Sequence, residues 1–214
     1  MVRVSELSRH SGVPVATIKY YLREGLLPKG EATSATQAVY SETHLRRLRL
    51  IRALVEGSGV PLTKVRAILD ALDDTGVDLH HLLGTVQYAL TPETTPTDTP
   101  EWREAERNTE ELLARLGWRV SPSSPARPRL THAIATVMGL GYQVGPRTLD
   151  TYANAAHMTA ERDLDRIDPA APRERAVEHV AIITALMDQM LVALRALAQE
   201  DVSARRLRGT DARY

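Results

Sequence analysis

Two short helical patterns separated by a glycine-containing turn lie near the N-terminus of the chain. The first pattern spans Val4–His10. The second spans Val15–Glu24 and places Ile18 and Leu22 at helical spacing for burial. The intervening Ser11–Pro14 supplies a glycine for the tight turn and a proline suited to the start of a helix. A helix, a turn with glycine and a second helix together predict a helix-turn-helix.

A polar, threonine-containing stretch without helical period, Lys29–Val39, follows these two helices. We interpret it as a wing made of two short strands around a loop. Ser41 has the position of a helix N-cap, and His44 stands where a capping box prefers glutamate. Further helices are predicted over Glu42–Gly57 and Leu62–Leu72, each with buried leucines and isoleucines. The N-terminal part is therefore predicted to be a winged helix-turn-helix.

The remainder of the chain is predicted to be helical, so the fold class is mainly α with a small β wing. A short helix at 78–90 leads to the Pro/Thr-rich linker TPETTPTDTP, which cannot form a regular element. Further helices are predicted at Glu101–Leu116, Leu130–Leu140, Pro146–Asp165 and Pro172–Gln199. The predicted domains are a DNA-binding domain at 1–74, a short helix with linker at 75–100, a helical dimerisation and effector domain at 101–208, and a tail at 209–214.

The composition excludes several classes of protein. The chain has no cysteine, which excludes disulfides and thiolate metal sites. The N-terminus has no apolar signal region, and no run reaches the ~18 apolar residues of a membrane span. We therefore expect a cytoplasmic protein with no membrane partner.

The charge distribution is uneven, although the net charge is zero. Through Leu69 the chain has 11 Lys and Arg against 5 Asp and Glu, a balance of +6, and the remainder carries −6. A basic N-terminal third is typical of a nucleic-acid-binding domain.

Four segments in the N-terminal third resemble MerR-family transcriptional regulators. The sequence TIKYYLREGLLP resembles the recognition-helix signature T-I-R-Y-Y-E-x-x-G-L-[LI]-P of that family. Three further segments resemble the end of its wing, the helix after the wing and its second wing. The four are Thr17–Pro28, Tyr40–Ser41, Leu45–Ile51 and Val60–Arg66, and the resemblance covers residues 1–72.

The resemblance implies a homodimer that binds a near-palindromic site in double-stranded promoter DNA. It also implies that bending and untwisting of that DNA lets RNA polymerase engage both promoter elements, an indirect partnership. The chain departs from the family at three places. Lys19 replaces the usual arginine, and the wing stretch Thr36–Tyr40 lacks the family's arginine. The long dimerisation helix expected after residue 72 is interrupted by Gly76 and the linker.

Because the first residues of a recognition helix meet base edges in the major groove, the DNA-contact candidates cluster there. Lys19 can donate to guanine, Thr17 can touch a thymine methyl, and tyrosines can reach phosphates. Alternatively, one of the two tyrosines lies half in the core, and Lys64 is an ordinary solvated lysine. Among Arg46 and the other arginines of its helix, at least two are expected to face solvent or their own chain. The candidates are Val15, Thr17, Lys19, Tyr20, Tyr21, Arg23, Gln37, Tyr40, Arg46 and Lys64.

The second half offers weaker signals. The predicted last helix is apolar on more than one face, which indicates either a subunit interface or burial within one chain. Trp118, Tyr142 and Tyr152 either line an apolar pocket for a small-molecule effector or belong to the core. His157 with Glu161 offers too few ligands for a metal, so neither a metal nor another cofactor is expected.

The leading hypothesis is a ligand-responsive dimeric regulator of transcription. The alternative is an architectural or recombination accessory protein that uses the same DNA-binding head without promoter control. Such proteins are usually basic throughout, whereas the second half of this chain is acidic. The sequence contains no nucleophile–base pair, phosphate loop or metal set, and no enzyme activity is predicted.

Overall fold

The computed structural model describes residues 1–34, 37–57 and 59–208, and its contacts divide the chain into two compact units. The first unit combines residues 1–86 with the chain from Ala171 onward, and the second comprises Gln87–Ala170. The second unit is therefore an insertion in the sequence of the first. The turn of the wing at 35–36 and the tail predicted at 209–214 lie outside the described residues.

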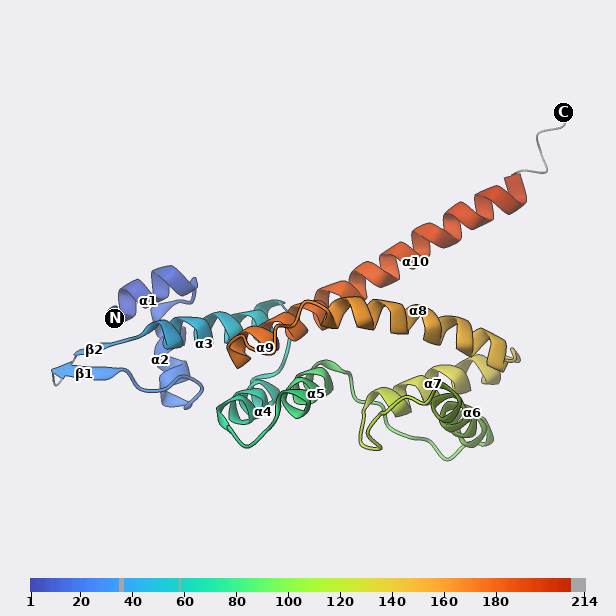
Figure 1. The fold of residues 1–214 in the computed structure, drawn as a ribbon, viewed down its shortest axis with the longest axis horizontal. Coiled ribbons are helices and arrows are strands. Elements are labelled where there is room, and N and C mark those ends of the chain that lie inside the picture. Colours follow the sequence, from blue (N-terminus) through green and yellow to red (C-terminus); the bar gives the residue numbers. More distant parts are fainter. Residues whose placement is uncertain (35–36, 58, 209–214) are drawn as a thin grey trace. The chain divides into compact units, whose positions relative to one another are not determined.

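The N-terminal helices α1 (Val4–Ser11) and α2 (Val15–Arg23) form the predicted helix-turn-helix (Figure 1). Gly12 ends α1 with a φ of 72°, a left-handed conformation that favours glycine. Leu7 from α1 and Ile18 from α2 are both fully buried, which fixes one helix against the other.

The predicted wing consists of the antiparallel strands β1 (Glu31–Ser34) and β2 (Gln37–Val39). Directly after β2, Tyr40 pairs with Val2, and each backbone N–H donates to the other's carbonyl oxygen at 2.8 Å. The wing is therefore tied to the residues that precede α1.

The head continues with α3 (Glu42–Arg52), a π-helical segment η1 (Ala53–Gly57) and α4 (Leu62–Asp73). Ser41 donates its backbone N–H to His44 Nδ1 at 3.1 Å, so the imidazole takes the place of the glutamate of a capping box. These elements supply most of the fully buried side chains of the head, namely Leu48, Leu50, Ile51, Leu54, Val65, Ile68 and Leu69.

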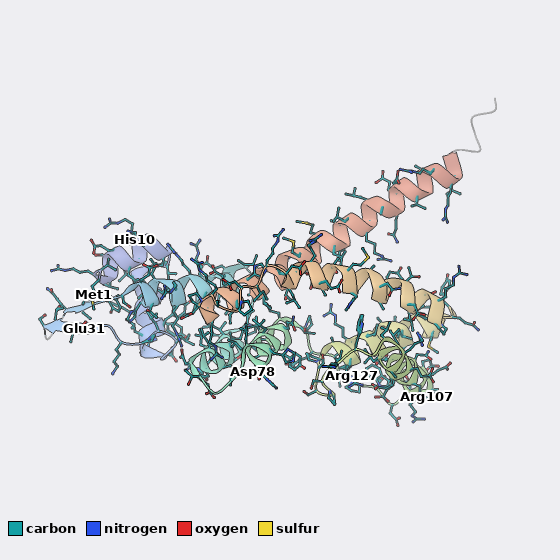
Figure 2. All side chains as sticks on the ribbon, viewed as in Figure 1. Met1, His10, Glu31, Asp78, Arg107 and Arg127 are labelled. Carbon is teal, nitrogen blue, oxygen red and sulfur yellow. The ribbon has the colours of Figure 1, made fainter. Side chains whose placement is uncertain are left out.

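The chain returns to the first unit with α9 (Arg173–Ile182), followed by η2 (Ile183–Met187), α10 (Asp188–Ser203) and η3 (Ala204–Arg208). Helix α9 packs against α3 and η1 (Figure 1). By contrast, α10 has no buried residue, and its side chains project from the helix along its length (Figure 2).

This arrangement differs from the predicted helical domain at 101–208. The prediction assigned the last helix to the same domain as the helices after the linker, but α9 belongs to the unit that contains the head. The cause is a set of small apolar side chains that α9 buries within that unit, namely Ala176, Val177, Val180 and Ala181.

The second unit contains the end of α5 (Leu79–Leu90) and the helices α6 (Pro100–Leu116), α7 (Ala126–Gly139) and α8 (Pro146–Leu164). Its core is small, and its buried members are Ala105, Leu112, Ile134, Leu149 and Ala153. No helix in the described residues is long and apolar enough to span a membrane.

Helix α7 begins four residues before the predicted start at Leu130. Pro128 falls in its first turn, where backbone N–H groups have no acceptor within the helix. The proline therefore costs no intrahelical hydrogen bond there.

Candidate nucleic-acid interface

Helix α2 separates a buried face from an exposed polar face. Ile18 and Tyr21, three residues apart, are buried. Lys19 and Arg23, four residues apart, are exposed on another side of the helix. The half-buried candidates of this helix are Val15, Thr17 and Tyr20. The exposed face therefore carries the cations that a recognition helix needs.

Tyr20 and Arg23 lie against each other on this face. The guanidinium carbon of Arg23 is 5.3 Å from the centroid of the Tyr20 ring, within the range of a cation–π contact. Arg23 Nε also donates to Glu24 Oε1 at 3.4 Å. These contacts restrict both side chains before any DNA binds.

Tyr21 belongs to the core, and a DNA contact by its hydroxyl stays a prediction. Only 6% of the residue is exposed. Burial, with a smaller contribution from the carboxylate of Glu56, raises the pKa of its hydroxyl above the usual value. This burial supports the alternative that one of the two tyrosines, Tyr20 or Tyr21, packs into the core.

A groove of about 440 Å³ lies between the start of α1, helix α2 and the wing. Arg3 and Lys19 line it with their cationic side chains, and Gln37 adds an amide. Cations and hydrogen-bond donors on an open groove suit the phosphate backbone of DNA. The sequence had indicated Lys19 and Gln37, but Arg3 precedes the first helix and belongs to no motif, so it was missed.

Tyr40 lines the same groove although only 7% of it is exposed. The ring of His44 stands edge-on to the Tyr40 ring, with centroids 5.3 Å apart. At Gly30 a Cβ atom would lie 2.8 Å from Tyr40 Cε1 and 2.7 Å from the carbonyl oxygen of Val39. Glycine therefore permits the close approach of the two ends of the wing, a role that the sequence did not reveal.

The four arginines of α3 have different surroundings. Arg46 is half-buried, and within the described part of the chain its Nε is buried without a hydrogen-bond partner. Arg47 forms a bidentate ion pair with the carboxylate of Asp73, and Arg52 pairs with Glu56 at 2.6 Å. Two of the four, Arg47 and Arg52, thus make contacts within their own chain, and a DNA contact by Arg46 stays a prediction.

Lys64 is the third residue of α4 and is half-buried. Its backbone N–H donates to the carbonyl of Pro61 at 2.9 Å, which places the lysine in the first turn of the helix. The positive end of the helix dipole lies at this turn, so the location suits a phosphate contact. Its role on DNA stays a prediction.

The three predicted effector-binding residues belong to the second unit. Trp118 is half-buried against the small core, and its ring stacks on His157 with centroids 5.6 Å apart. His157 Nε2 lies 3.4 Å from Glu161 Oε1. Tyr142 is 69% exposed and Tyr152 is 54% exposed. Binding of an effector by these three side chains stays a prediction.

Comparison with known proteins agrees with this reading of the head. The family described as "MerR HTH family regulatory protein" matches residues 2–72. The mercuric resistance operon regulatory protein of Bacillus cereus is 35% identical over 71 residues, which are 33% of this chain and 53% of that protein. The HTH-type transcriptional regulator MerD of Acinetobacter calcoaceticus is 37% identical over 75 residues, 34% of this chain and 62% of that protein.

The matches thus span half to three-fifths of the curated relatives and only the N-terminal third of this chain. A solved structure extends the likeness to nearly the whole chain. SCO5550 of Streptomyces coelicolor A3(2), assigned as a transcriptional regulator, is 38% identical with a TM-score of 0.75, covering 96% of this chain and 98% of the other. Residues 2–72 are a MerR-family helix-turn-helix domain, the DNA-binding domain of a transcriptional regulator.

Proposed function

We propose that the protein acts as a homodimer that places two heads on a near-palindromic promoter site, and that a small-molecule effector binds the unit at 87–170. A single head presents one recognition helix and one wing, and single modules of this size bind DNA weakly. Two heads related by a two-fold axis read two half-sites at once. RNA polymerase is affected indirectly, through the shape of the bound promoter.

The observation that carries the dimer is the exposed apolar face of α10. At about 100° per residue, this face spans roughly 140° of the helix surface. A stripe of that width matches the face that a helix normally buries against a partner. We call it the α10 stripe, and it consists of Met190, Leu191, Leu194, Leu197, Ala198 and Val202, all exposed in the single chain.

A second copy of α10 is the occupant that we propose for this stripe. Polar residues such as Gln199 and Glu200 lie on the other side of the helix, so two copies can pair face to face and keep their polar sides in water. Near the C-terminal end of the stripe, before Val202, Asp201 lies on the same face and pairs with Arg205 of η3 at 3.0 Å. The apolar surface is therefore unbroken only from Met190 to Ala198.

The proposal of an effector rests on the separate second unit. That unit has its own core and interrupts the sequence of the first unit, as an added sensing module would. Trp118 offers a flat aromatic surface there, and His157 and Glu161 add polar groups beside it.

Lys19→Ala tests sequence-specific binding by the head. Lys19 is exposed and lines the groove beside the wing, where its ammonium can donate to guanine O6 or N7. We expect affinity for a duplex selected in vitro to fall about 10-fold and base preference to relax at one position in each half-site. Footprinting competition between the selected duplex and its single-base variants measures both effects.

The control is Lys29→Ala, which removes an exposed lysine that does not line the groove. This variant is expected to keep the base preference of the wild-type protein. An unchanged base preference in Lys19→Ala would contradict a base contact by this residue.

A screen of metabolites by thermal unfolding tests the effector. A ligand present at ~100 times its dissociation constant stabilises the folded protein by about 2.7 kcal/mol, which raises the melting temperature measurably. We expect at least one compound to do so, and Trp118→Ala to abolish the shift. If no compound in a broad library raises the melting temperature, the sensing role is contradicted.

A further inference from the structure

Arg173, the first residue of α9, forms a clamp on the end of α4. Its Nη1 donates to the carbonyl of Asp74 at 3.0 Å, and its Nη2 donates to the carbonyls of Val77 at 2.7 Å and Ala71 at 3.4 Å. The last carbonyls of a helix have no partner within it. The guanidinium satisfies the one that belongs to Ala71, together with the carbonyls of Asp74 and Val77 beyond the helix end, and its charge complements the negative end of the helix dipole.

The clamp joins parts of the chain that lie far apart in sequence. Arg173 and Asp74 are 99 residues apart, and Arg173 lies two residues after Ala171, where the chain re-enters the first unit. The apolar face of α9 with Val177 and Val180 buries itself within the same unit, against α3 and η1. Helix α9 therefore holds α3 through apolar packing and α4 through hydrogen bonds.

Helix α4 carries a DNA-contact candidate at its opposite end. Lys64 lies in the first turn, and Val65, Ile68 and Leu69 bury the helix along the turns between Lys64 and the clamp. A helix of 12 residues moves as one body, so a shift of its C-terminus also displaces its first turn.

We propose that Arg173 is a positioning residue for DNA binding, because its hold on α4 sets where Lys64 meets a phosphate. The proposal rests on the proposed function in DNA binding and on the phosphate contact predicted for Lys64. According to this proposal, a displacement of the chain where the inserted unit joins α9 changes the affinity of the head for DNA.

The test is a double-mutant cycle with Arg173→Ala and Lys64→Ala in the full chain. The affinity for a duplex selected in vitro by the wild-type protein is measured at several salt concentrations. Loss of one phosphate contact in each head of the dimer removes two contacts, which lowers affinity roughly 25- to 100-fold at ~0.1 M salt and reduces the slope of log K against log salt by about 1.8. We expect each single variant to show this change and the double variant to show no more than either.

Two further variants separate positioning from general damage. Arg175→Ala removes an exposed arginine two residues along the same helix and is expected to leave affinity and slope unchanged. Arg173→Lys keeps the charge but loses the forked geometry, so its slope should lie between those of Arg173→Ala and the wild type. Assays are run below the melting temperature of each variant, so that unfolding does not enter the affinity.

The outcomes distinguish the two proposals. If Lys64→Ala lowers the slope but Arg173→Ala does not, or if their effects add, the clamp proposal is overturned and the Lys64 contact stands. If Lys64→Ala leaves the slope unchanged, the Lys64 contact is wrong and the clamp proposal falls with it.

Discussion

Replacing Leu194 and Leu197 together by aspartate should make the protein monomeric and lower its affinity for a duplex with two half-sites. Both side chains lie in the α10 stripe and are 56% and 62% exposed in the single chain. The substitutions place carboxylates where two copies of α10 would meet, and unpaired carboxylates are costly to bury. Linked binding of two heads strengthens the complex by about 100-fold or more, and a monomer loses that gain. Analytical ultracentrifugation measures the mass, and a binding titration measures the affinity.

The matched control is Val192→Asp on the same helix. Val192 is 70% exposed, but it lies roughly 150° around the helix from the centre of the α10 stripe. Substitutions at exposed positions usually change stability by less than ~0.5 kcal/mol, so both variants should remain folded. We expect the control to stay dimeric and to bind DNA like the wild type. A dimeric double variant, or a control that dissociates equally, would place the interface elsewhere.

The head was predictable because its signals are local. Glycine at the end of α1, helical spacing in α2 and the polar stretch of the wing each act over a few residues, and the structure has all three elements in place. Tyr21 could also have been placed in the core, because it follows the buried Ile18 by three residues. Because Tyr21 lies within the family motif, a DNA contact by its hydroxyl was predicted instead.

The partners of the C-terminal helices could not be predicted from sequence. The apolar pattern of 172–199 indicated burial but not what would cover it, because periodicity identifies a face and not its neighbour. The structure divides that run: Val177 and Val180 are buried within the first unit, while Leu194 and Leu197 stay exposed. One helical run thus combines a segment packed on the head with a segment that has an exposed apolar face.

The same limit applies to the arginines of α3. Arg47 and Arg49 are alike in sequence, but Arg47 is 7% exposed and Arg49 is exposed. The partner of Arg47, Asp73, is 26 residues away at the end of α4, and no local pattern connects them. Counting basic residues therefore overstates how many are available to DNA.

Arg47→Ala should lower the free energy of unfolding by about 3 kcal/mol, the lower part of the range for breaking a buried ion pair. Arg47 Nε donates to the carbonyl of Leu26 at 2.7 Å, and its two terminal nitrogens hold the carboxylate of Asp73 at 2.6 and 2.7 Å. The side chain thereby joins α3 to the loop after α2 and to the end of α4. We choose the lower part of the range because the Asp73 side chain is 57% exposed and regains water when its partner is lost.

Denaturant unfolding of Arg47→Ala and of Arg49→Ala measures this difference, and Arg49→Ala is expected to change stability by less than ~0.5 kcal/mol. The DNA assay supplies an independent criterion. Because Arg47 faces its own chain, the variant should keep the salt dependence of the wild type at temperatures where it is folded, whereas loss of a phosphate contact in each head would reduce the slope by about 1.8. A stable Arg47→Ala variant with a reduced slope of log K against log salt would instead make Arg47 a DNA contact. The bidentate ion pair between Arg47 and Asp73 would then have to break when DNA binds.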